Sequence, residues 1–163
     1  GTIRTSASGQ CEDSQLRRFV WNGSNRCVRP LRVVETTTSW TYTSRTPRPF
    51  NNNTANRLEM VLGLLEDSLQ VTFCAFARAS SSAFFSVGLG LDSTSEDDPM
   101  VIKNAGSSTT GDGIMAAYCG LPGQAGYHFI QLLEVGGSSV TTTFFGNNGT
   151  GTDQAGACGF VMA

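Results

Sequence analysis

Residues 56–76 read NRLEMVLGLLEDSLQVTFCAF and fit two different local structures. One is an amphipathic helix, because Asn56 followed by Glu59 imitates a capping box. The apolar side chains agree with the i, i+3, i+4, i+7 spacing of a helix face, which is met by Leu58, Val61, Leu62, Leu65 and Leu69. Taken alone, this spacing predicts a helix.

The same residues also fit two strands joined by a short acidic turn. Gly63 falls in the middle of the helical pattern, and the polar residues 66–68 interrupt it. Beyond that break, apolar and polar residues alternate strictly from Leu69 to Ala77. Local preferences tend to agree with the global fold, and the neighbouring segments are strand-like, so we predict a hairpin of RLEMVLGL and SLQVTFCAFARA.

The rest of the chain repeats short strands separated by turn residues. VVETTTSWTYTS, from Val33, alternates as one long strand until Pro47, Pro49 and a run of Asn end it. Further strands are predicted at AFFSVGLGLD, MVIKN, GIMAAYCG, YHFIQLLEV, VTTTFFG and ACGFVMA. This spacing predicts an all-β fold, an antiparallel jelly-roll-like β-sandwich over residues 33–163.

Residues 1–32 differ from the sandwich because they are polar and rich in arginine. Phe19, Val20 and Trp21 precede Asn22-Gly23, a dipeptide that favours a two-residue hairpin turn. We therefore predict a small N-terminal hairpin that acts as a connector or appendage.

Composition excludes several classes of function. Charged residues make up 15% of the 163 residues, against about 25% in ordinary soluble domains, and the net charge is −2. We expect no nucleic-acid binding, because no basic field is present, and no membrane insertion, because no apolar run approaches about 20 residues. Residue 1 is Gly rather than Met, so we expect the chain to be a piece of a longer protein.

The five cysteines predict neither a zinc site nor a full set of disulfides. There is no C-x-x-C pair and a single histidine, His128, and an odd number of cysteines cannot all pair. Cys11 and Cys27 flank a polar, turn-rich segment and are candidates for a disulfide in an oxidising compartment. Buried free thiols are predicted inside apolar segments at Cys74, Cys119 and Cys158.

Catalysis is not indicated by any motif. His128 shares a predicted strand face with Ile130 and Leu132, which favours a structural histidine over a general base. The loop DSTSEDD places oxygen atoms at alternate positions, but it lacks the central Gly and distant Glu of an EF-hand. We expect no enzyme activity, no cofactor and no bound metal.

Binding of a glycan is the better class of function. Glycan-binding sites use the faces of aromatic rings and polar side chains that can make two hydrogen bonds, and these residues usually lie on loops. The candidate ligand-binding residues are Trp40, Tyr42, Arg45, Arg48, Asn147 and Asn148. Core or subunit packing is the favoured interpretation of Trp40 and Tyr42, and turn chemistry is favoured for the Asn runs.

Several phrases within residues 38–163 resemble the C-terminal domains of tail fibres, tailspikes and virion spikes of bacteriophages and prophages. They are WTYTSRTPRP, NNNTANRLEMVLGLLEDSLQVT, VGLGLDSTS, AYCGLPGQAGYHFIQLLE and TTTFFGNNGTGTDQAGACGFVMA. Members of this family carry alternating Val where this chain has RLEMVLG, and that likeness also favours a strand. The first 30 residues lie outside the resemblance.

The resemblance implies a homotrimeric tip domain on the virion surface, made in the bacterial cytoplasm. Its partner would be a bacterial surface polysaccharide or another host receptor. Two alternatives stay open: the C-terminal module of a polysaccharide-depolymerase tailspike, and a purely structural trimerisation cap.

Overall fold

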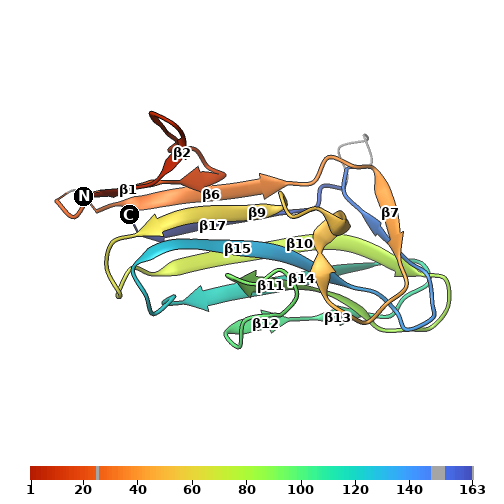
Figure 1. Cartoon of the computed structure of the whole chain (residues 1–163). Coiled ribbons are helices and arrows are strands. Elements are labelled where there is room, and N and C mark those ends of the chain that lie inside the picture. The colour runs from red at the N-terminus through yellow and green to blue at the C-terminus, as the bar shows by residue number, and fades with distance from the viewer. Residues whose placement is uncertain (25, 148–152, 163) are drawn as a thin grey trace.

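The computed structural model describes residues 1–24, 26–147 and 153–162. Two antiparallel sheets lie face to face and enclose one hydrophobic core, as the sequence predicts (Figure 1). Within the described ranges the only helical segment is the 3₁₀ turn η1 (Phe50–Asn52), and no helix has the length and apolarity needed to cross a membrane.

The larger sheet is built around the long strand β10. One edge of β10 pairs with β14 along its length, and the other edge is shared by β17 and β16. β6 then pairs with β17, β7 with β16, and β12 with β14. The strands are β6 (Val28–Val34), β7 (Ser39–Tyr42), β10 (Leu69–Ala79), β12 (Val101–Lys103), β14 (Asp112–Gly120), β16 (Thr142–Phe145) and β17 (Gly156–Met162).

The smaller sheet is built around β15. It pairs with β11 on one edge, and β9 and β8 share the other edge. A short parallel strand, β4, adds to β9, and β13 adds to β11. The strands are β4 (Arg17–Arg18), β8 (Arg48–Pro49), β9 (Arg57–Leu62), β11 (Phe85–Leu91), β13 (Ala105–Gly106) and β15 (Gly126–Val135).

The segment 56–76 forms strands and not a helix, but the predicted hairpin is wrong. β9 pairs with β15 in the smaller sheet, whereas β10 pairs within the larger sheet. The connection between them therefore crosses from one sheet to the other. The burial pattern explains the difference: β9 is buried on both faces from Leu58 to Leu62, while β10 alternates strictly between buried and outward positions.

The single long strand predicted from Val33 is two strands in the structure, and each pairs with a different neighbour. β6 ends at Val34 and β7 begins at Ser39. Between them the buried carboxylate of Glu35 accepts hydrogen bonds from the backbone N–H of Thr36 (2.9 Å) and Thr37 (2.8 Å), and from Nδ2 of Asn56 (2.5 Å). The sequence pattern missed this break because Thr residues suit strands and turns alike.

Glu35 makes the stability of this corner sensitive to acid. Burial acts to raise the pKa of Glu35, but hydrogen bonds from Thr37 and Asn56 outweigh it, and the pKa lies below its ordinary value. A carboxyl group with a lowered folded-state pKa stabilises the fold above its unfolded pKa, and this contribution is lost as pH falls through the folded value. We expect Glu35→Gln to destabilise the protein by about 1–3 kcal/mol at pH 7 and by much less at pH 3.

Calorimetric melting at both pH values checks this prediction, with Glu66→Gln as the exposed control. A loss of stability in Glu35→Gln that is the same at pH 3 and pH 7 would contradict the prediction.

The N-terminal segment is packed with the sandwich. The Asn22-Gly23 hairpin does not form: β5 (Val20–Trp21) pairs with β1 (Thr2–Ile3), and the small hairpin near the N-terminus joins β2 (Thr5–Ala7) to β3 (Gln10–Cys11). In Figure 1 β2 stands away from the two sheets, while β1 and the C-terminal end of β17 lie at the same end of the sandwich.

The predicted boundary at residues 32/33 falls inside a strand of the larger sheet, because β6 begins at Val28. Phe19 and Trp21 belong to the single core, so their burial overrides the preference of Asn-Gly for a hairpin turn. The backbone carbonyls of Gln15 and Leu16 accept hydrogen bonds from Arg32 of β6 and Glu59 of β9. Residues 15–18 therefore bridge the two sheets.

Candidate functional site

Three of the predicted binding residues lie together, around a buried carboxylate. Glu134 on β15 is fully buried and accepts hydrogen bonds from Nε1 of Trp40 (2.6 Å) and Nε of Arg48 (2.7 Å). The Arg48 guanidinium also stacks on the Tyr42 ring at 3.7 Å, and the Tyr42 hydroxyl donates to the carbonyl of Thr46 at 2.7 Å. These contacts hold the proline loop against the sandwich, so Nε1 of Trp40 and Nε of Arg48 are already engaged.

The interior position of Glu134 dominates its chemistry. Burial raises the pKa of Glu134 above its ordinary value, and the hydrogen bonds from Trp40 and Arg48 oppose that shift only in part. Trp40 packs edge-on against Phe50 with ring centroids 4.7 Å apart. The cluster is a structural anchor beneath the loop.

The other predicted binding residues are elsewhere. Arg45 lines a shallow pocket of about 130 Å³ with Phe84, Phe85 and Val135 among its walls. Asn147 donates from Nδ2 to Oε1 of Gln154 at 3.2 Å, across an isolated bridge. Asn148 lies outside the described residues. The predicted residues therefore do not form one site.

The cysteines correct the sequence interpretation. All five lie within the described ranges as exposed free thiols, and Cys11 and Cys27 do not form the candidate disulfide. Cys74, Cys119 and Cys158 were expected to be buried, but each occupies an outward position of its strand. The apolar residues next to each cysteine in the sequence point inward, because side chains alternate between the two faces of a strand. An apolar segment therefore does not show that the cysteine within it is buried.

We call the outward surface of β12, β14, β10, β17 and β6 the outer face. Alternation along these strands leaves it unusually poor in charge for a protein surface, and the charged side chains among its described positions are Arg32 and Arg78. Large exposed apolar side chains stand on it at Val28, Val34, Ile102 and Met115. Isolated exposed apolar residues are common, but this group is spread over one continuous sheet surface.

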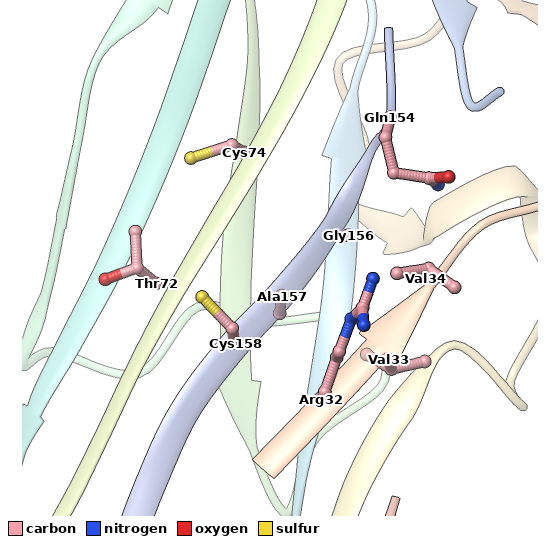
Figure 2. A pocket seen from close by; sticks show the side chains of 9 residues that line it. All are labelled: Arg32, Val33, Val34, Thr72, Cys74, Gln154, Gly156, Ala157 and Cys158. Atoms are coloured by element: carbon pink, nitrogen blue, oxygen red, sulfur yellow. The ribbon is translucent and has the colours of Figure 1, made fainter. Parts of the chain in front are cut away.

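A groove of about 240 Å³ lies on the outer face, lined by residues of β6, β17 and β10. Figure 2 shows Cys74 and Cys158 on adjacent strands with Thr72 nearby, and Arg32 on the next strand, where it pairs with Cys158. The pKa of Cys74 is raised, mainly by partial burial and to a smaller extent by the nearby Cys158 thiol. Cys74 therefore favours the protonated, less nucleophilic form.

His128 has structural partners, as expected. Its Nδ1 lies 2.7 Å from Oδ2 of Asp92, and its Nε2 lies 2.9 Å from the carbonyl of Gln124. Within the described part of the chain, no three His, Cys, Asp or Glu side chains gather closely enough to hold a metal ion.

A second feature was missed by sequence reasoning. A cavity of about 190 Å³ lies between the N-terminal segment and the smaller sheet, and we call it the arginine pocket. It is lined by Arg4, Thr5, Ser6, Arg17, Phe19, Arg57 and Glu59. The one hint in the sequence was the number of arginines before residue 30, but no spacing pattern tied them to Arg57.

Glu59 is the buried centre of the arginine pocket. It accepts hydrogen bonds from the Tyr127 hydroxyl (2.8 Å) and from Nε of Arg57 (3.0 Å), and Nε of Arg17 lies 3.5 Å away. Burial acts to raise the pKa of Glu59, but these partners outweigh it and lower the pKa. Glu59 is therefore a fixed negative charge that orients two guanidinium groups.

No known protein-family model matches this chain, and no curated protein matches it either.

Proposed function

We propose that this chain is a surface domain of a bacteriophage virion, at the tip of a tail fibre or spike. It recognises the bacterial host surface, through a glycan, and assembles as a homotrimer. The proposal is supported by the phrases in residues 38–163 that resemble such tips, and by the antiparallel sandwich that these residues build. The single observation in the structure that supports the assembly is the charge-poor outer face.

The outer face suits contact with a second copy of the chain. Cores of protein interfaces are depleted in charge, and the outer face keeps its two arginines on β6 and near the end of β10. Strand spacing and rise give the five strands a flat footprint of roughly 500 Å². A standard interface takes about 800 Å² from each partner, so this face supplies more than half of one.

Native mass in solution, measured by light scattering with and without reductant, tests the assembly. We expect about three times 17.3 kDa in both conditions, because burial of the outer face needs no disulfide. Reductant is needed in the comparison because exposed thiols such as Cys74 and Cys158 can cross-link copies. A monomer in both conditions overturns the trimer.

A charge placed on the outer face is expected to break the assembly. Met115 is 45% exposed, lies on β14 and stands opposite Cys74 on β10. In Met115→Glu, an unpaired carboxylate would be desolvated in the contact, so we expect dissociation to monomers. Met100→Glu is the matched control, since Met100 is 56% exposed but lies in a loop, and its mass should not change.

Host recognition is tested with labelled protein on a panel of bacterial strains and on their purified surface polysaccharides. We expect binding to a subset of strains and its inhibition by the matching polysaccharide. A trimer that binds neither cells nor polysaccharide would contradict recognition and favour the structural trimerisation cap.

A further inference from the structure

The arginine pocket holds more positive than negative charge. Three guanidinium groups, from Arg4, Arg17 and Arg57, line it with a single carboxylate, that of Glu59. Arg17 also pairs with Glu12 at 3.1 Å, outside the lining. Among the described residues, no carboxylate lies within ion-pair distance of Arg4. An anion entering the pocket would therefore complete the charge pairing.

The guanidinium groups are held in place before any ligand arrives. The Cζ atom of Arg4 lies 3.3 Å from the centroid of the Tyr127 ring, and that of Arg57 lies 5.0 Å from the centroid of Phe129. Stacking on an aromatic face restricts the planar fork of arginine, which lowers the entropy lost when the fork binds a carboxylate or phosphate.

The pocket also offers uncharged hydrogen-bonding groups. The exposed residues Thr5 and Ser6 add hydroxyl groups to the lining, and hydroxyl groups can bond to those of a sugar.

We propose that the arginine pocket binds an oxyanion substituent, a carboxylate or phosphate, of an acidic saccharide. The identification of the ligand as a saccharide rests on the proposed host recognition; the preference for an oxyanion rests on the pocket alone. The pocket lies over the smaller sheet, because Arg57 and Glu59 alternate with the core residues Leu58 and Met60 of β9. It is therefore on the opposite side of the sandwich from the outer face.

Calorimetric titration with three probes tests the ligand class. The probes are tetragalacturonate, its fully methyl-esterified form and inorganic phosphate. We expect the acid to bind at least tenfold more tightly than the ester, and phosphate to compete with the acid. Equal binding of acid and ester overturns the proposal, and so does a lack of binding by both anionic probes.

Variants of Arg4 test the location. Arg4→Met keeps an apolar side chain against Tyr127 and leaves no carboxylate without its cation, so we expect a normal melting temperature. We expect the affinity for tetragalacturonate to fall at least tenfold. Arg4→Lys restores the charge without the fork, and should recover part of the affinity. Arg78→Met removes the same charge from β10 of the larger sheet, outside the pocket, and should bind as wild type. Equal losses in Arg4→Met and Arg78→Met would overturn the assignment.

Labelled wild-type and Arg4→Met proteins on the bacterial panel separate this inference from the proposed function. Weaker cell binding by Arg4→Met supports both. Undiminished cell binding by Arg4→Met shows that the pocket takes no part in host recognition and overturns the assignment of its ligand as a host saccharide, while the proposed function stands. Wild type that binds tetragalacturonate but no strain contradicts host recognition and leaves the oxyanion site in place.

Discussion

Glu134→Ala is expected to lose about 3 kcal/mol of unfolding free energy, a large part of the stability of an ordinary domain. The carboxylate of Glu134 is fully buried and is the acceptor for both Trp40 and Arg48. Its removal leaves the indole N–H without an acceptor inside the sandwich and releases the guanidinium that holds the proline loop. Urea denaturation followed by circular dichroism measures the loss.

Two companion variants give the cause of that loss. Glu134→Gln keeps the volume and one acceptor, so it should lose less than Glu134→Ala. Arg48→Ala leaves Glu134 without its cation. Because burial raises the pKa of Glu134, its ionisation disfavours the fold, and its contribution is greatest below the unfolded pKa and declines as pH rises through the folded value.

The loss of unfolding free energy caused by Arg48→Ala should therefore increase between pH 4 and pH 7. If Glu134→Ala unfolds with wild-type free energy, the loop is held by other contacts and the anchor is not important.

The sequence predicted strands well and their partners poorly. Alternation marks which side chains of β10 point inward, because one face of that strand meets the core and the other does not. It says nothing about which sheet receives β9, since that choice depends on β15, more than sixty residues away along the chain. The predicted hairpin failed for this reason, although both of its strands exist.

The candidate site was hidden for a related reason. Trp40 and Arg48 have the residue types of a glycan site, but Glu134 engages both, and a contact across 94 residues leaves no local trace. In the arginine pocket, the pairing of β4 with β9 likewise places Arg17 beside Glu59, and the backbone hydrogen bond from Arg4 to Phe19 accompanies the packing of Arg4 on Tyr127. The composition shows that arginine is frequent before residue 30, but only the fold brings three arginines together in one pocket.

The two proposed surfaces are compatible in one assembly. The outer face belongs to the larger sheet and the arginine pocket lies over the smaller one, so burial of the first against a neighbouring copy leaves the second exposed. Three weak anion sites on one trimer would bind a repeating polysaccharide with the avidity of linked sites. Met115→Glu should therefore weaken cell binding while the affinity of each site for tetragalacturonate is unchanged.

Asp67→Ala is the second substitution with a large expected effect, about 3–5 kcal/mol. Asp67 is fully buried in the connection between β9 and β10. Its carboxylate accepts hydrogen bonds from Nε1 of Trp21 (2.7 Å), Nη2 of Arg26 (2.5 Å) and the backbone N–H of Gly63 (3.1 Å) and Leu64 (3.0 Å). Alanine would leave these donors unpaired at once.

The loss should be visible at Trp21 as well as in overall stability. The Trp21 ring lies so close to Gly63 that a Cβ there would stand 2.0 Å from Cδ2 of the ring, so the docked indole depends on this connection. We expect the Trp21 indole N–H signal in ¹H–¹⁵N spectra to shift to a solvent-exposed position. Glu66→Ala, at the exposed neighbouring residue, should stay within about 0.5 kcal/mol of wild type. A stable Asp67→Ala with an unshifted Trp21 signal would show that the N-terminal segment is held by β4 and the core alone.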